Sequence, residues 1–278
     1  MSDELKRGAA TDVAPDDVLA RDASADVRAF YLQAAFRALL DAMARPGELA
    51  ELPAPEPRLR DEAKRCGLTP SALMLADVLI DAATTFAVAG TGASAAAPAA
   101  REPHAPVAPV AAERELSIRT HCPARPVDEA LYVFVPAAVR GEAAAAAVKA
   151  LTPGTLASPH LGATCVVECG TLLGASADGA RTGSASGSEP TATYVLSGPG
   201  VDGTAQLTCD RAEVVDARLD RADEFPCGID LVFVDGAGHV ACIPRSTKVG
   251  AAEGAAPADA ADIARTAADK EGGSAWAM

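Results

Sequence analysis

The sequence has few aromatic residues and little positive charge. Aromatic side chains make up 4% of its 278 residues, with a single tryptophan. The core must therefore be built mainly from leucine, valine and isoleucine. The chain has 24 lysine and arginine residues against 38 aspartate and glutamate residues, which gives a net charge of −14. This balance argues against a nucleic-acid or anionic-membrane surface, because both attract excess positive charge. We expect neither nucleic acid nor membrane as a partner.

Paired cysteines and long apolar runs are also missing. The seven cysteines include no CxxC pair, and the chain is too large for a disulfide-stapled miniprotein, so we expect reduced, mostly buried thiols. Cys165 and Cys169 would lie ~13 Å apart on a straight strand, which is too far for one metal ion, and we expect no metal site. No stretch reaches the ~18 to 20 apolar residues of a membrane span. The amino terminus carries acids throughout, which is unlike a signal peptide. These features predict a cytoplasmic protein.

The length fits one domain. Residues 1–25 and 250–278 are rich in alanine, acids, glycine and proline, and we expect both to be disordered tails because they offer little to bury. Two internal stretches, near 90–109 and 174–190, have linker composition and are expected to be flexible loops. A single α/β domain is therefore predicted over residues 26–249.

Periodicity places helices and strands within this domain. A helix is predicted over 26–45, with an apolar face made of Leu32, Phe36, Leu39, Leu40 and Met43. Pro46-Gly47 should end it. A second helix should begin at Thr69-Pro70, a cap followed by proline, and an alanine-rich helix is expected over 138–151. Strands are expected over 85–89, 131–135, 164–169, 193–196, 204–215, 229–234 and 239–243. This mixture indicates an α/β sheet.

No self-sufficient active site can be read from the residues. The sequence contains neither a GxSxG elbow nor a GxxxxGK[ST] phosphate loop. Arg245 follows the last apolar strand, where its planar fork could bind a carboxylate or phosphate. A salt bridge to an acid such as Asp230 explains the same arginine equally well, and both interpretations stay open. Asp81 ends the second helix, where a negative charge is unfavourable, so a tertiary partner is plausible.

Several segments occur in an order that resembles a known family. Residues 36–47 read FRALLDAMARPG, residues 79–84 read LIDAAT, and residues 154–164 run from Gly-Thr to Gly-Ala-Thr. Residues 225–231 read FPCGIDL, residues 243–247 read IPRST, and residues 196–200 read LSGPG. Together they resemble the H subunit of the bacterial carbon-phosphorus lyase system, the PhnH family, which serves phosphonate use.

The resemblance implies a fold and a set of site residues. The fold would be an α/β mixed-sheet sandwich similar to the large domain of transferases that depend on pyridoxal phosphate, in a family that lacks the cofactor and its lysine. No catalytic residue is expected. Candidate interface or ligand-binding residues are Asp81, Thr84, Asp230, Arg245, Ser246 and Thr247. Structural motif residues are Pro46, Gly47, Gly154, Thr155, Gly162, Phe225, Pro226, Gly228 and Pro244.

The same resemblance implies partners and a role. The protein would associate with the G, I, J and L subunits and form a homodimer. With G, I and L it would support transfer of the ribose triphosphate of magnesium ATP to methylphosphonate, with release of adenine and the I subunit as catalyst. Magnesium ATP would be a substrate of the complex, and this chain would bind no cofactor. The alternatives are a stand-alone enzyme of the pyridoxal phosphate fold, a homodimer that binds a ligand near Asp230 and Arg245, and a structural homodimer without ligand.

Overall fold

The computed structural model describes residues 15–90, 108–175, 181–185 and 189–251. The helices are α1 (Pro15–Ala44), α2 (Pro57–Cys66), α3 (Pro70–Leu79), α4 (Ala108–Thr120), α5 (Gly141–Ala150) and α6 (Ala212–Leu219), with a short 3-10 turn, η1, at Pro159–Leu161. Among the described residues, none of these helices has both the length and the apolar character needed to cross a membrane.

The described residues contain eleven strands, which form two sheets. The first sheet has the order β1-β10-β9-β4-β3-β2 and is mixed, because β2, β3, β4 and β9 run parallel while β10 and β1 run antiparallel. The second sheet has the order β11-β7-β8-β5-β6 and is antiparallel throughout. The bounds of the first sheet are β1 (Ala50–Glu51), β2 (Phe86–Val88), β3 (Tyr132–Val135), β4 (Thr164–Cys169), β9 (Asp230–Asp235) and β10 (His239–Ile243). Those of the second are β5 (Thr171–Ala175), β6 (Arg181–Ala185), β7 (Ala192–Ser197), β8 (Ala205–Cys209) and β11 (Lys248–Ala251).

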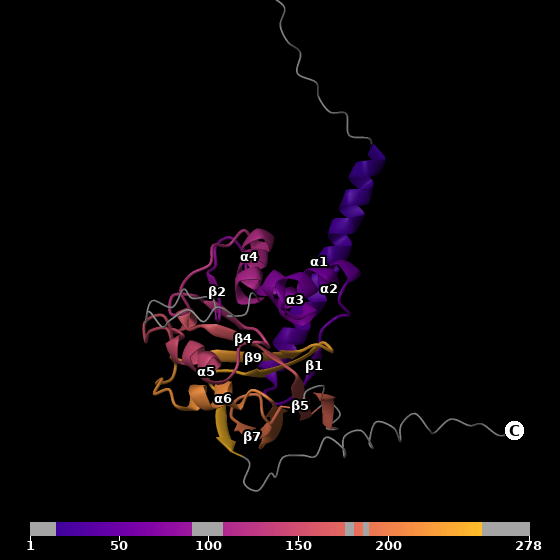
Figure 1. Cartoon of the computed structure of the whole chain (residues 1–278). Coiled ribbons are helices and arrows are strands. Elements are labelled where there is room, and N and C mark those ends of the chain that lie inside the picture. Colours follow the sequence, from indigo (N-terminus) through magenta and orange to yellow (C-terminus); the bar gives the residue numbers. More distant parts are fainter. Residues whose placement is uncertain (1–14, 91–107, 176–180, 186–188, 252–278) are drawn as a thin grey trace, which may run out of the picture.

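The mixed sheet lies between two cores. Successive side chains of a strand point to opposite faces, so Val166 and Val232 pack with α1 to α4, while Val167 and Phe233 pack with α5, α6 and the second sheet. Figure 1 shows these two layers on either side of β4 and β9. Because both faces are covered, the central strands are apolar along their whole length, as buried parallel strands are. The α/β prediction is confirmed, with a second sheet as an added layer.

Most of the predicted elements are present, with local corrections. Thr69 caps α3 by accepting a hydrogen bond from Ala72 N at 3.2 Å, and α1 ends at Ala44 just before Pro46-Gly47. Helix α1 begins at Pro15, so part of the expected tail is helical. The expected loop 174–190 contains β6, and the strand expected over 204–215 divides into β8 and α6. The other parts of the expected tails and loops, residues 1–14, 91–107, 176–180, 186–188 and 252–278, lie outside the described residues.

The predicted apolar face of α1 is confirmed in part. Leu39 is buried and Met43 packs against the core, but Phe36 is 45% exposed and Leu40 is 49% exposed. The remainder of the packed face is made of small residues, Ala35, Ala38 and Ala42. Small side chains let a helix approach its neighbours closely, and this tertiary preference overrides the pattern of large apolar residues.

The cysteine prediction is confirmed. All seven cysteines are free thiols, six of them are buried, and Cys227 is partly exposed. Burial raises the pKa of the Cys165 and Cys209 thiols to about 12. Such thiols stay protonated and unreactive in the folded chain.

Candidate functional site

Three of the family-like segments meet at the edge of the mixed sheet where its parallel strands begin. Asp230 begins β9, and Gly162 lies just before β4, so both are at the amino ends of parallel strands. Pro244 follows β10, which runs antiparallel to β9 and pairs Ile243 with Leu231. The loops before β9 and before β4 are joined by a hydrogen bond from Gly228 N to Pro153 O at 2.9 Å. We call this meeting point the amino-edge cluster, formed by residues 153–162, 225–230 and 243–247.

Arg245 and Asp230 form the centre of the amino-edge cluster. The Nη2 of Arg245 lies 2.5 Å from Oδ2 of Asp230, and Nε lies 3.1 Å from the same oxygen. The backbone N–H of Arg245 also donates to Asp230 Oδ1 at 2.7 Å. The two side chains are only 18% and 11% exposed. The salt bridge that the sequence left as one of two interpretations is therefore present.

The remaining donors of Arg245 hold the neighbouring loop. Its Nη1 donates to the carbonyl of Pro159 at 2.5 Å, and its Nη2 donates to the carbonyl of Gly162 at 3.2 Å. Gly162 has no room for a side chain, because a Cβ there would collide with the carbonyl oxygen of Gly228 and with the Arg245 guanidinium. All three guanidinium nitrogens are thus bonded within the chain, through four of the five N–H groups, so most of this fork is occupied by internal contacts.

The other motif residues build turns around the same cluster. Thr155 Oγ1 accepts a hydrogen bond from Ser158 N at 3.0 Å, and Gly154 adopts a positive φ of 75°. Phe225 precedes a cis-proline, Pro226, and its side chain is 72% exposed. Thr247 is buried, and Ser246 is half-buried.

The LSGPG turn joins the amino-edge cluster to the end of α1. A Cβ at Gly198 would lie 3.2 Å from Ser246 O, and one at Gly200 would collide with the carbonyl of Ala44. Gly47 lies against Ala205 in the same way. Positive φ values of 130°, 81° and 91° at these three glycines explain why glycine is required there. Pro46-Gly47 therefore stops α1 and also packs on the second sheet.

Asp81 and Thr84 lie elsewhere on the same edge. They precede β2, which is three strands from β9, or about 14 Å at the usual strand spacing. Asp81 Oδ1 accepts from Ala83 N at 2.9 Å, and Asp81 N donates to Thr84 Oγ1 at 3.1 Å, both in an exposed local turn. The structure thus separates these two candidates from Arg245. The expected partner of Asp81 is the turn that follows it.

The opposite edge of the sheet is filled by a polar network that the sequence did not reveal. Ligands of open α/β sheets bind beyond the carboxyl ends of the strands. Here Arg211, which is fully buried, donates to the carbonyls of Glu168 and Val139 at 2.6 Å each. The Glu168 carboxylate accepts from Thr69 N at 2.5 Å and from Ala137 N at 2.8 Å. Burial raises the pKa of Glu168. Arg211 and Glu168 thus lie at the carboxyl ends of the strands, where open α/β proteins usually bind their ligands. Through Thr69 they also connect the start of α3 to the end of β4.

A second buried carboxylate at this edge, Asp235, bonds to Ser184 and His239. Its Oδ2 lies 2.6 Å from Ser184 Oγ and 2.7 Å from His239 Nδ1. Burial opposes ionisation, but the hydrogen bonds from His239 and Ser184 lower the pKa of Asp235, and the hydrogen bond to Asp235 raises that of His239. In a catalytic triad the histidine stands between serine and acid. Here the acid is central, so the group joins β6 to β9 and β10.

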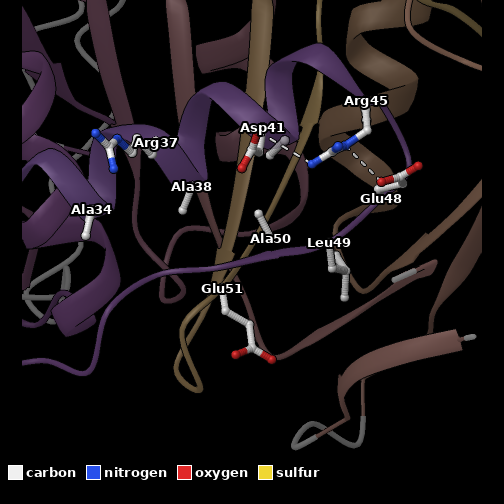
Figure 2. Close-up of a pocket in the computed structure, with 10 residues that line it drawn as sticks. Ala34, Arg37, Ala38, Asp41, Arg45, Glu48, Leu49, Ala50 and Glu51 are labelled. Atoms are coloured by element: carbon white, nitrogen blue, oxygen red, sulfur yellow. Dashed lines mark ion pairs between the residues drawn. The ribbon is translucent and has the colours of Figure 1, made fainter. Parts of the chain in front are cut away.

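A groove lies between α1 and β1. It has a volume of about 420 Å³ and a floor of alanines, and Figure 2 shows Arg37, Asp41 and Arg45 along its helical side. Arg45 pairs with Asp41 at 3.5 Å and with Glu48 at 3.0 Å. Arg37 has no ion pair with any residue drawn in Figure 2. Within the described ranges, no three histidine, cysteine or acidic side chains are grouped so that they could hold a metal ion.

Taken together, these sites offer binding and structural contacts. Charged groups at both sheet edges are paired within the chain. Nucleophilic catalysis needs a nucleophile within reach of a free base, and neither Ser184 nor the buried cysteines have one, since Asp235 is already bonded to His239 and to backbone amides. The exposed features of the described surface are the groove and several apolar side chains.

Comparison with known proteins agrees with this description. Residues 25–250 match the family described as bacterial phosphonate metabolism protein (PhnH). No curated protein matches the chain. The match covers most of the chain, including the whole amino-edge cluster, and it confirms the resemblance inferred from the motifs. The chain belongs to the PhnH family and has a role in bacterial phosphonate metabolism, within machinery that works through protein partners.

Proposed function

We propose that this chain is the H-type accessory subunit of the carbon-phosphorus lyase core complex. In this role it supports transfer of the ribose triphosphate of magnesium ATP to methylphosphonate by the G, I and L subunits, with release of adenine. It also associates with J and acts in the cytoplasm. The family match supports the pathway, and the contacts that Arg245 makes within the chain support a non-catalytic part in it.

The proposed fold relation fits the same role. The chain adopts a mixed sheet with α1 to α4 on one face and α5, α6 and the second sheet on the other, and this layered α/β arrangement supports the proposed relation to pyridoxal phosphate transferases. Lys248 begins β11 of the second sheet, away from the carboxyl edge where Arg211 and Glu168 fill the ligand position. We propose that the chain keeps this fold without cofactor, and that it serves as a scaffold.

The test is co-purification. A tagged I subunit is expressed with G, J and this chain, and the eluted material is run on size exclusion. The proposal predicts that this chain elutes with the other subunits in constant ratio. Elution of this chain on its own, at every salt concentration tested, would contradict it.

The main alternative is a stand-alone ligand-binding homodimer or enzyme that uses Asp230 and Arg245. One observation favours a ligand in this region. Asp230 begins β9 and Arg245 follows β10, so both residues lie among the loops that connect the strands. The bonded state of Arg245 argues against it. A purified protein with the yellow colour of a pyridoxal phosphate Schiff base would support the enzyme.

A further inference from the structure

Helix α1 turns several large apolar side chains to solvent. Its packed face contains Ala35, Ala38, Leu39 and Ala42, with Tyr31 and Met43 partly buried beside them. On the outside, Phe36 and Leu40 are 45% and 49% exposed. Phe30, earlier in the helix, is 70% exposed. Apolar side chains therefore lie on both sides of α1, and those on the outer side are available to another surface.

The exposed residues cover a sector of α1 about 120° wide, because Phe30 and Phe36 are six residues apart on a helix of 3.6 residues per turn. Phe36 and Leu40 are four residues apart and therefore lie one above the other on the helix surface. Phe30 and Arg37 are seven residues apart, which is about two turns, so they point in nearly the same direction from the helix axis. This direction lies beside that of Leu40. Arg37 also lines the groove beside β1 (Figure 2). We call Phe30, Phe36, Arg37 and Leu40 the outer face of α1.

The described part of the chain does not cover this face. In Figure 1 the amino-terminal half of α1 extends away from the body formed by the two sheets and the other helices. Val27, at the start of this region, is 64% exposed as well. Contiguous apolar residues with a charged residue at the border are typical of protein interaction sites.

We propose that the outer face of α1 binds a helix from another subunit of the carbon-phosphorus lyase assembly. The inference rests on the proposed function. Phe36 and Leu40, at i, i+4 spacing, form a ridge that fits the groove between side chains of a second helix. Arg37 makes no ion pair with the residues around it in Figure 2, and covering it requires a partner carboxylate, because a buried charge must be paired. The partner helix therefore presents apolar side chains to Phe36 and Leu40 and an acid to Arg37.

A second copy of this chain fits the face less well. Each copy carries a net charge of −14, so two copies repel each other over distance. The partner that the charges favour is a less acidic protein with one acid placed beside its apolar stripe.

The experiment measures binding of the purified chain to the G–I–J complex by biolayer interferometry, with the chain immobilised. There are three test variants: the double variant Phe30→Ser with Phe36→Ser, the single variant Leu40→Ser, and the single variant Arg37→Glu. Arg37→Lys tests charge, and the double variant Leu156→Ser with Phe225→Ser is the matched control, because those side chains are 70% and 72% exposed elsewhere on the surface. Thermal unfolding of every variant is recorded, and Phe30→Ser alone serves if Phe36→Ser unfolds the chain.

We expect each test variant to weaken binding at least about tenfold, as truncation of interface anchors does. Arg37→Lys should retain more binding than Arg37→Glu, and the matched control should bind like the wild type. Equal binding by all variants would overturn the inference while leaving the proposed function intact. Absence of binding by the wild type would overturn both. A wild-type dimer that the test variants convert to a monomer would show that the occupant is a second copy, and so would also overturn it.

Discussion

Replacing Arg245 by alanine tests whether the amino-edge cluster is held by one ion pair. The variant removes the bonds of Nε and Nη2 to Asp230 and leaves that carboxylate, 11% exposed, with the backbone N–H of residue 245. It also frees the carbonyls of Pro159 and Gly162. Breaking one partner of a buried pair costs about 3–5 kcal/mol. Because both groups keep some solvent contact, we expect about 3 kcal/mol, or about 6–12 °C in Tm for a domain of this size.

The assay is urea unfolding followed by circular dichroism, with a double-mutant cycle. Asp230→Ala alone should also destabilise, and the double variant Arg245→Ala with Asp230→Ala should be less destabilised than the sum of the two by about 2 kcal/mol. Arg60→Ala is the control, because Arg60 is exposed, and it should change stability by no more than about 0.5 kcal/mol. A loss below about 1 kcal/mol for Arg245→Ala, or strict additivity in the cycle, would refute the reasoning. If such a stable variant lost partner binding, Arg245 would be an interface residue.

Three further predictions concern packing, pH and thiol access. Gly162→Ala should destabilise the chain by at least about 2 kcal/mol, because its Cβ meets Gly228 O and Arg245, whereas Gly236→Ala, which has open space around it, should be nearly neutral in the same unfolding assay. The raised pKa of His239 means that its bond to Asp235 stabilises the fold below about pH 6.5 and loses this effect as the pH rises through the raised value. The destabilisation by His239→Gln should therefore be about 1 kcal/mol at pH 5.5 and smaller at pH 9, and a constant difference would contradict the assignment. For the lowered pKa of Asp235 the sign is opposite, so its contribution is lost only as the pH falls below about 4 and through the lowered value. In a thiol-reagent assay of the native protein only Cys227 should react fast, because the other six cysteines are buried, and fast reaction of three or more would show that the core opens readily.

Local patterns predicted the elements well. The strand Thr164–Cys169 and the capped start of α3 follow from residues that are adjacent in sequence. The prediction failed after Cys209, because Val214 and Val215 favour a strand by propensity, while the chain turns at Asp210 and Arg211 and continues as α6. Propensity does not record that a buried arginine at this turn binds carbonyls of distant segments.

The candidate site was only partly predictable. The salt bridge of Arg245 could be proposed because both partners end or begin strongly apolar strands. The network around Arg211 could not, because its partners Glu168 and Val139 lie 43 and 72 residues away. The outward orientation of Phe36 and Leu40 was missed for a related reason. Periodicity identifies a stripe of apolar residues, but only tertiary contacts decide whether that stripe or the alanine face meets the sheet.

The most direct test of the account is adenine release from magnesium ATP and methylphosphonate by purified G, I and L subunits, measured with increasing amounts of this chain. If it is the accessory subunit, release should depend on this chain and saturate at a fixed ratio to the I subunit. Lys248→Ala should support the same release, since the proposed function gives this lysine no part in a cofactor site. Full release in the absence of this chain, or a chain that releases adenine without the I subunit, would contradict the account.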